Sequence, residues 1–504
     1  MICEARVNLR SLLLLALLPA ATLPAEVVLP KVLTSHMVVQ RDLPVHVWGK
    51  AAPGEDVTVS FRGETLSIKA GELGRWSAYL KPGTAGGPFV MTVKGTKADG
   101  SAQWITLDDV LVGDVWLASG QSNMQFQMSQ AATAAADLPH AGIDSMRLLT
   151  IERRTAEYPA DDVESWGWKI STPESAKDFS AVAWYFAREI AQRENVPVGI
   201  IDSTWGGTVA ESWVRLTALG EDASLAPLFA TRGRMTDREA DALLEDKRQQ
   251  KLRDEAKSAG KPEPQFSWHP MLAMWGPSLI YNGMIAPLTS MPIRGVIWYQ
   301  GESNSPLERA PLYHRIFRTL IEDWRNQWGE GDFPFLFTQI SNFKSNATED
   351  WATVREQQRK TLELRNTAMA VTIDIGNPDN VHPTDKVDVG HRLALTARAL
   401  SYGEAVEYSG PHFRQVTTEG SSLRLWFDHA RGLNFKDNKA TGFEVAGADG
   451  KFVAATAKID GANVVVSSPD VAEPLLVRYG WANSPECNLF NGDGLPASPF
   501  SSVK

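Results

Sequence analysis

The sequence predicts an α/β protein in which a parallel sheet, with helices on both faces, is flanked by two β-rich domains. Between about residue 106 and residue 403, five apolar runs of strand length alternate with helical stretches, and this alternation is typical of a parallel sheet. On both sides of that region, short alternating runs are bounded by glycine and proline, which is typical of β-sandwiches. A hydrophobic content of 43% is enough for an ordinary core.

These patterns divide the chain into three folded parts. Residues 26–105 and 404–504 are predicted to form N-terminal and C-terminal β-sandwich-like domains, and residues 106–403 the central domain. Within the central domain, a charged segment at about 232–262 is predicted to form a solvated helical insertion. The predicted parallel strands are 110–118, 196–201, 293–299, 333–340 and 368–375, and the predicted helices are 179–193, 312–328 and 389–400.

Residues 1–25 predict a secretory signal peptide. Arg6 and Arg10 precede a leucine-rich apolar segment at residues 12–18, which is too short to span a bilayer. Cleavage after this segment would remove Cys3 and leave Cys487 as the single cysteine, so the mature chain would hold no internal disulfide. We therefore expect an exported protein, periplasmic or extracellular.

Charge and composition limit the ligands. The formal net charge is −10 and no run of lysine or arginine interrupts the sequence, which argues against nucleic acid as a partner. The 17 tryptophans are mostly core residues, but aromatic faces also line sugar-binding clefts and weakly favour a carbohydrate. No second apolar segment predicts stable membrane insertion. No zinc-type or P-loop pattern occurs, so neither a metal nor an organic cofactor is predicted.

Ser122 is the candidate nucleophile. It follows the first predicted strand and the turn at Ser119 and Gly120, and a short helical segment follows it. A serine at such a strand-to-helix turn is exposed at the sheet edge, where N–H groups at the helix start can hold an oxyanion. Met124 replaces the second glycine of the G-x-S-x-G elbow, so the motif differs from that of the α/β-hydrolases. A polar loop serine is the alternative interpretation.

His382 is the candidate general base. It follows the fifth predicted strand, and Asp379 precedes it by three residues. A carboxylate beside an imidazole fixes its tautomer, and the imidazole then takes the serine proton. The carboxyl ends of parallel strands share one edge of the sheet, so Ser122 and His382 are expected to lie close together. His391, inside a predicted helix, is interpreted as structural.

Two other strand ends carry polar residues. Gly206 and Gly207 follow the second predicted strand, and paired glycines let the backbone approach a ligand and offer it an N–H. Gln300, Glu302 and Asn304 follow the third and supply donors and a carboxylate. Each stretch alone also fits an ordinary turn or loop cap.

Four sequence blocks together resemble a known family. GDVWLASGQSNM, GGTVAESW, GVIWYQGESN and DNVHPTDK are similar to the conserved blocks of SGNH-type carbohydrate esterases, in particular the sialate O-acetylesterase-like group. The resemblance implies an SGNH-hydrolase (flavodoxin-like) three-layer α/β/α domain. It also implies a serine esterase that removes O-acetyl groups from a carbohydrate, with sialate O-acetylesterase activity expected first and acetylated xylan or xyloglucan as the alternative substrates.

The resemblance also assigns roles. It implies Ser122 as nucleophile and His382 as base, with the oxyanion held by the Ser122 N–H, by Gly206 or Gly207 and by a side chain of the third block. The superfamily has an asparagine in a G-x-N-D pattern there, whereas this chain has QGESN.

Two assignments therefore stay open. Gln300 is the favoured third oxyanion donor, with Asn304 or Glu302 as alternatives. Asp379 is the favoured acid, but esterases with a QGE block resemble a Ser-His-Glu arrangement, which would use Glu302.

The substrate-binding residues are less specific. Arg215 and Arg355 are candidate cations for a sialate carboxylate. A non-catalytic carbohydrate-binding protein and a lipid or thioester hydrolase are the competing functions. The candidate substrate-binding residues are Gln121, Asn123, Trp205, Glu211 and Arg355.

Overall fold

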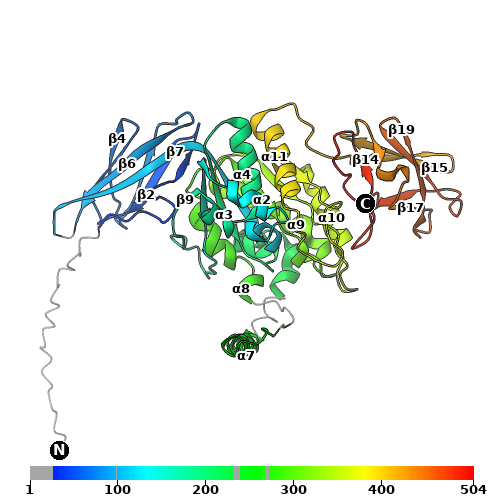
Figure 1. The fold of residues 1–504 in the computed structure, drawn as a ribbon, viewed down its shortest axis with the longest axis horizontal. Helices are drawn as coiled ribbons and strands as arrows, with labels where there is room; N and C mark the ends of the chain where they lie inside the picture. Colours follow the sequence, from blue (N-terminus) through cyan, green and yellow to red (C-terminus); the bar gives the residue numbers. More distant parts are fainter. Residues whose placement is uncertain (1–25, 98, 231–238, 265, 267–271, 504) are drawn as a thin grey trace, which may run out of the picture.

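The computed structural model describes residues 26–97, 99–230, 239–264, 266 and 272–503. The predicted signal peptide at residues 1–25 lies outside them. A central domain of helices around a sheet stands between two β-rich ends, the N-terminal one in blue and the C-terminal one in orange and red (Figure 1). The prediction of an α/β protein with β-rich domains at both ends is confirmed.

The central sheet holds six parallel strands in the order β13-β12-β11-β7-β10-β8, with β9 antiparallel on the β8 edge. All five predicted strands are present. The sixth, β8, was not predicted because Arg147 interrupts its apolar run; Arg147 is buried and forms an ion pair of 2.8 Å with Asp109. The strands are β7 (Ala102–Gly120), β8 (Ile143–Thr150), β9 (Lys169–Ser171), β10 (Val198–Thr204), β11 (Gly295–Tyr299), β12 (Phe335–Thr338) and β13 (Thr367–Ala370).

Helices cover both faces of this sheet. Trp116 on β7 packs edge-on against Phe186 of α4, and its indole N–H donates to Tyr402 of α11. Trp298 on β11 pairs in register with a residue three places after Trp116, so it points to the opposite face. There it contacts Phe317 of α9. The longer helices are α4 (Ala181–Glu194), α9 (Tyr313–Trp328), α10 (Trp351–Lys360) and α11 (Val387–Tyr402); short helices are α1 (Ser122–Gln125), α2 (Ala134–Asp137), α3 (Pro173–Lys177), α5 (Leu216–Gly220) and α8 (Leu272–Trp275).

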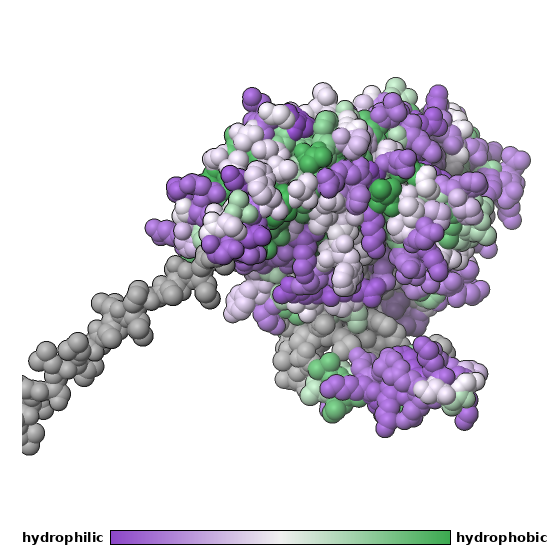
Figure 2. Space-filling model, turned by 60° about the vertical axis from the view of Figure 1, so that its left-hand side comes forward, coloured by the Kyte–Doolittle hydropathy of each residue, from purple (hydrophilic) through white to green (hydrophobic). Residues whose placement is uncertain are grey.

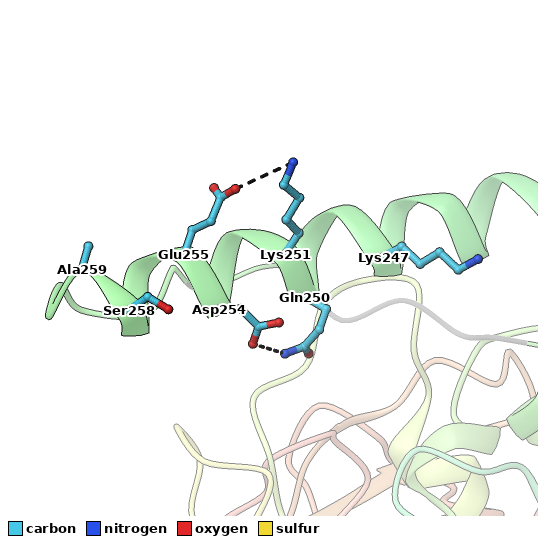
Figure 3. Close-up of a pocket in the computed structure, with 7 residues that line it drawn as sticks. All are labelled: Lys247, Gln250, Lys251, Asp254, Glu255, Ser258 and Ala259. Atoms are coloured by element: carbon cyan, nitrogen blue, oxygen red, sulfur yellow. Dashed lines mark hydrogen bonds and ion pairs between the residues drawn. The ribbon is translucent and has the colours of Figure 1, made fainter.

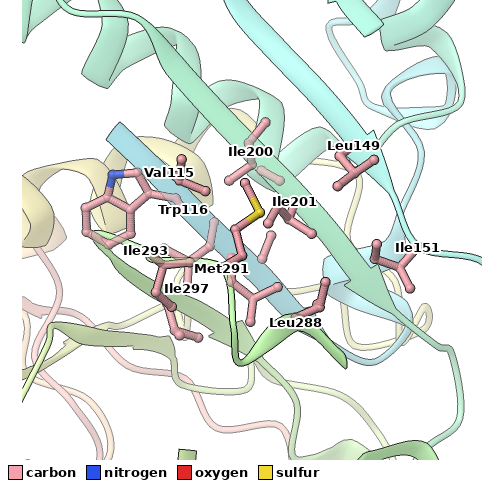
Figure 4. Close-up of a cluster of buried hydrophobic side chains, with 14 of the residues drawn as sticks. Val115, Trp116, Leu149, Ile151, Ile200, Ile201, Leu288, Met291, Ile293 and Ile297 are labelled. Atoms are coloured by element: carbon pink, nitrogen blue, oxygen red, sulfur yellow. The ribbon is translucent and has the colours of Figure 1, made fainter. Parts of the chain in front are cut away.

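The interior of the sheet is packed with aliphatic side chains. Figure 4 shows residues from β7, β8, β10 and the segment leading into β11 converging on one cluster. Parallel strands buried on both faces read as near-continuous apolar runs, which is why these strands were predictable. The labelled members of the cluster are Val115, Trp116, Leu149, Ile151, Ile200, Ile201, Leu288, Met291, Ile293 and Ile297.

The N-terminal domain shares a strand with the central sheet. The first part of β7 pairs antiparallel with β6, and its last part lies between β10 and β11. The domain boundary predicted at residue 105 therefore falls inside a continuous strand rather than a linker. The other strands of this domain are β1 (Val38–Gln40), β2 (Val45–Lys50), β3 (Asp56–Phe61), β4 (Glu64–Lys69), β5 (Arg75–Leu80) and β6 (Gly86–Thr96).

The C-terminal domain follows α11 and has a hydrophobic cluster of its own. Its last segment returns to the central domain, where Ser498 accepts a hydrogen bond of 2.9 Å from Gln339. Its strands are β14 (His412–Glu419), β15 (Ser422–Asp428), β16 (Asn434–Phe435), β17 (Phe443–Ala446), β18 (Val453–Ala454), β19 (Thr456–Asp460), β20 (Asn463–Ser467), β21 (Leu476–Tyr479), β22 (Leu489–Phe490) and β23 (Phe500–Ser501).

The charged insertion contains one long helix, α7 (Glu239–Ser258). It projects from the central domain, and Figure 2 shows it below the main body as a largely hydrophilic extension. The first residues of the predicted insertion, up to residue 238, lie outside the described part. None of the described helices combines the length and the apolar character needed to cross a membrane.

Candidate active site

The candidate nucleophile lies where β7 ends, at the centre of the parallel sheet. Gly120 closes β7 with φ of 132°, and a Cβ there would lie 2.2 Å from the carbonyl oxygen of Tyr299 on β11. Only glycine fits such a close approach at a positive φ. The chain then turns into the single-turn helix α1, which begins at Ser122. The strand-to-helix turn predicted around Ser122 is therefore present.

Ser122 and His382 are brought together as predicted. The Oγ of Ser122 lies 2.8 Å from Nε2 of His382, a normal hydrogen-bond distance between a nucleophile and its base. His382 is half-buried on the loop between β13 and α11. Burial, together with the positive charge of Lys386, lowers the pKa of His382. The imidazole therefore stays neutral, as a proton acceptor must, to a lower pH than an exposed histidine.

A buried polar chain lies beneath this pair. Lys386 donates to Oδ1 of Asn123 at 2.7 Å, and Nδ2 of Asn123 donates to Glu302 at 2.6 Å and to the carbonyl of Val381 at 3.0 Å. Asn123 and Lys386 are each 1% exposed and Glu302 is 8% exposed. Asn123 thus ties a buried carboxylate to the residue that precedes His382.

Burial shifts the pKa values of Lys386 and Glu302, the two ionisable groups of this hydrogen-bonded network. It lowers the pKa of Lys386 to about 7, and it raises the pKa of Glu302 despite the hydrogen bond from Asn123. The ammonium also faces the rings of Phe126 and Tyr299 at 4.7 and 5.6 Å, an arrangement that favours a cation. The second carboxylate oxygen of Glu302 is buried and has no partner among the described residues.

Asp379 does not lie on His382, contrary to the favoured prediction. Its side chain is 81% exposed and forms an ion pair of 3.3 Å with Lys344. Within the described chain, Nδ1 of His382 has no hydrogen-bond partner. The D-x-x-H spacing was misleading because the loop turns the aspartate outward to solvent. Glu302 is the carboxylate that the fold places beneath the pair.

Gln300 and Asn304, the predicted oxyanion donors of the third block, form hydrogen bonds inside the protein. Gln300 and Asn304 are both 0% exposed. The amide nitrogen of Gln300 donates to Asn304 at 2.7 Å and to the carbonyl of Thr208 at 3.1 Å. The amide nitrogen of Asn304 donates to Glu211 at 2.9 Å. In this structure the amides of Gln300 and Asn304 hold the loops together, and neither residue is among those that line the hollow in front of Ser122.

The glycine pair lies beside Ser122, and the N–H of one of the two glycines already has a partner. A Cβ at Gly206 would lie 3.2 Å from Cβ of Ser122. The N–H of Gly206 donates to Oε1 of Gln125 at 2.6 Å, so a side chain already occupies the predicted donor. Gly207 adopts φ of 77°, and its carbonyl accepts from the indole of Trp275 at 2.8 Å. The N–H of Ser122 has no partner among the described residues.

Three of the predicted substrate-binding residues are buried and have partners inside the protein. Gln121 is 3% exposed and accepts a hydrogen bond of 3.1 Å from the N–H of Ser303, and Asn123 lies in the chain beneath the pair. Glu211, 1% exposed, pairs with Arg309. In this structure these side chains join the strand-end loops to one another, and none of them is among the residues that line the hollow in front of Ser122.

Arg355 and Arg215, the two candidate cations for a sialate carboxylate, already have partners within the protein. Arg355 is 0% exposed, and its guanidinium donates to the backbone carbonyls of Ser341, Ala482 and Asn483. Arg215 forms an ion pair of 2.6 Å with Asp323. Neither lines the space in front of Ser122. Trp205 is half-buried, and its N–H donates to the carbonyl that ends β7.

A hollow of about 580 Å³ opens in front of the Ser122–His382 pair. Its volume lies within the usual range for small-ligand sites. The sequence motifs predicted Ser122 and His382 but not the rest of its walls, which come from α1, the segment after it and the histidine loop. The lining residues are Ser122, Gln125, Phe126, Gln127, Gln130, Asn380, His382 and Thr384.

Outside the Ser122 site, another hollow lies on the surface of the insertion. The open hollow along α7 is lined by one helix alone, and Figure 3 shows its polar groups paired with each other, Lys251 with Glu255 and Gln250 with Asp254. It carries none of the chemistry found beside Ser122. Across the described residues, no three histidine, cysteine or acidic side chains gather as metal ligands would.

Comparisons with known proteins agree with this geometry. The sequence profile of the family described as "Carbohydrate esterase, sialic acid-specific acetylesterase" matches residues 267–399. The sialate O-acetylesterase of Mus musculus is 31% identical over 516 residues, covering 92% of each chain. The chain belongs to the sialate O-acetylesterase family. The Homo sapiens enzyme of the same name is 30% identical, covering 93% of this chain and 91% of its own.

A solved structure extends the likeness to the fold. The crystal structure of a carbohydrate acetylesterase from Xanthomonas citri superposes with a TM-score of 0.81 at 38% identity, covering 95% of this chain and 100% of that one. The predicted family resemblance and the predicted carboxylic ester hydrolase are thereby confirmed. This member of the sialate O-acetylesterase family keeps its serine and histidine at the carboxyl ends of the parallel strands.

Proposed function

We propose that this protein removes O-acetyl groups from carbohydrates, with O-acetylated sialic acid as its first expected substrate. The observation that carries the proposal is the hydrogen bond of 2.8 Å between Ser122 and His382, at the mouth of a hollow large enough for one sugar residue. The named relatives are sialate O-acetylesterases. A serine bonded to a half-buried, neutral histidine is the arrangement that ester hydrolysis requires.

The reaction has two steps, transfer of the acetyl group to Ser122 and then to water, and His382 accepts a proton in each. Ser122 attacks the acetyl carbonyl as His382 takes the hydroxyl proton, and the same proton then passes to the departing sugar oxygen, which leaves as a hydroxyl group. Water attacks the acetyl-serine with His382 again as base, releasing acetate. The lowered pKa of His382 keeps the imidazole unprotonated for both attacks.

Glu302 supports the base from below. Through Asn123 it reaches the carbonyl of Val381 and so fixes the backbone that carries His382. We propose Glu302 rather than Asp379 as the acidic partner of the pair, acting through Asn123 in the free enzyme.

One observation favours a second substrate class. No lysine or arginine is among the described residues that line the hollow, and both predicted cations are held elsewhere. A sialate carboxylate would be expected to meet a cation. A neutral O-acetylated sugar, such as acetylated xylan or xyloglucan, is therefore the second candidate.

Acetate release from matched substrates tests the proposal. Protein lacking residues 1–25 is given O-acetyl sialic acid and acetylated xylo-oligosaccharides, with Ser122→Ala as the background. We expect acetate from at least one, well above that background, because the pair is assembled. Faster release from the sialic acid supports the first candidate, and faster release from the xylo-oligosaccharides supports the second. Release from neither contradicts the proposal and favours a carbohydrate-binding protein.

We also propose that the chain is exported. The support is the basic start and short apolar segment of residues 1–25. In a bacterial host, the full-length chain is expected in the periplasmic or medium fraction, shortened near residue 25, while a version starting at residue 26 stays in the cytoplasm. Intact mass and fractionation check this. Full-length protein that remains uncleaved inside the cell would contradict it.

A further inference from the structure

The hydrogen bonds around Ser122 leave one side-chain amide available beside the nucleophile. We propose that Gln125 is the side-chain oxyanion donor of this enzyme, taking the place of the third-block residues. This inference rests on the proposed esterase function and adds a residue to its catalytic site. The amides of Gln300 and Asn304 cannot serve, because their N–H groups are used within the buried loops.

Helix α1 and the contact with Gly206 together place Gln125 next to the nucleophile. It lies three residues after Ser122 on the single turn of α1, and residues three apart share a helix face. Both residues line the same hollow. The point that a Cβ on Gly206 would occupy is 3.1 Å from Oε1 of Gln125 and 3.2 Å from Cβ of Ser122. The amide and the serine therefore flank Gly206 together.

The orientation of the Gln125 amide follows from its partner. The backbone N–H of Gly206 can only donate, so the atom that it meets at 2.6 Å is the amide oxygen. The NH₂ group consequently faces away from Gly206. It has no hydrogen bond to any described residue, although the side chain is half-buried at the wall of the hollow. An anchored amide with unused hydrogens is a preorganised donor.

In the first step, the Oγ–carbonyl carbon bond forms and the carbonyl π pair moves to oxygen, while the Ser122 proton passes to Nε2 of His382. The resulting oxyanion accepts hydrogen bonds from Nε2–H of Gln125 and from the Ser122 N–H. When the C=O bond re-forms, the sugar oxygen leaves with the proton from His382. The hydrogen bond from Gly206 polarises the Gln125 amide and makes its N–H a stronger donor.

Two substitutions test this role with para-nitrophenyl acetate and with the sugar ester that the wild type cleaves. Gln125→Met removes the amide, and Gln125→Glu retains an acceptor for Gly206 but replaces the donor by a carboxylate. We expect kcat to fall about 10²–10³-fold in both variants with KM changed little, as for other lost oxyanion donors. Gln192→Met, an exposed glutamine on α4, is the matched control and should keep full activity.

The alternative is that Gln125 merely covers the Gly206 N–H. In that case Gln125→Met would match or exceed the wild-type kcat, which would overturn the proposal, as would a change confined to KM. Equal thermal midpoints of the variants and wild type show that folding is unchanged. If Gln125→Met does not fold, Gln125→Ala decides by the same criteria, because it also removes the amide without adding a charge. Wild type that cleaves para-nitrophenyl acetate but no sugar ester would refute the proposed function while leaving this test valid.

Discussion

Replacing Ser122 by alanine is expected to lower acetate release at least about 10³-fold, because no other hydroxyl is hydrogen-bonded to His382 among the described residues. The loss should appear in kcat for every ester, since the covalent route itself is removed. Initial rates on para-nitrophenyl acetate and on the preferred sugar ester measure it. Thermal unfolding should be unchanged, because the side chain removed is small and only half-buried.

Ser258→Ala is the matched control for this experiment. Ser258 is an exposed serine at the end of α7, the helix that projects from the central domain, and it does not line the hollow in front of Ser122. It should retain wild-type rates. Hydrolysis by Ser122→Ala at more than a few per cent of the wild-type rate would show that another nucleophile, or direct attack by water, does the chemistry.

Replacing Lys386 by methionine is expected to lower the free energy of unfolding by about 3 kcal/mol. The change leaves Oδ1 of Asn123 unpaired and removes the cation that compensates the buried Glu302 carboxylate. The loss should grow as the pH rises. Burial lowers the pKa of Lys386 to about 7, so below that pH the protonated lysine carries a burial cost that methionine removes, and in acid Glu302, whose pKa is raised, takes up a proton. Denaturant unfolding across this pH range measures it.

The same substitution should shift the acid limb of kcat/KM. The charge of Lys386 lowers the pKa of His382, so removing it raises that pKa and the neutral base is lost at a higher pH. The double variant Lys386→Met/Glu302→Gln should recover part of the lost stability, because no uncompensated charge remains. Lys177→Met, at an exposed lysine, is the control. An unshifted acid limb and unchanged stability would contradict the role assigned to the buried chain.

The fold was largely predictable because its strands are buried on both faces. Runs such as that of β11 are apolar throughout and need no tertiary information to be seen as strands. The strand β8 was not predicted, because it contains the buried Arg147, whose partner Asp109 lies 38 residues away in the sequence. The predicted domain boundary at residue 105 falls within β7, which belongs to two sheets and whose sequence changes pattern without a break.

The site was predictable in part. Ser122 and His382 follow strand ends, and the parallel topology alone brings such positions to one edge. Asp379 and Gln300 were misassigned because spacing does not tell whether a side chain faces solvent or is committed to an internal hydrogen bond. Lys386 stands in the histidine block, yet its burial depends on the packing of Phe126 and Tyr299 around it. Gln125 has the right chemistry, but its orientation depends on Gly206.

Mass spectrometry of the enzyme quenched during turnover tests the central claim most directly. Wild-type protein mixed with a rapidly acylating acetyl ester should gain the mass of one acetyl group, and peptide mapping should locate that group on Ser122. Ser122→Ala should gain none under the same conditions. An acetyl group on Ser122 that disappears as acetate is released is the predicted result. Turnover without acetylation of Ser122 under conditions where deacetylation is slow, or with acetylation of another residue, would contradict it.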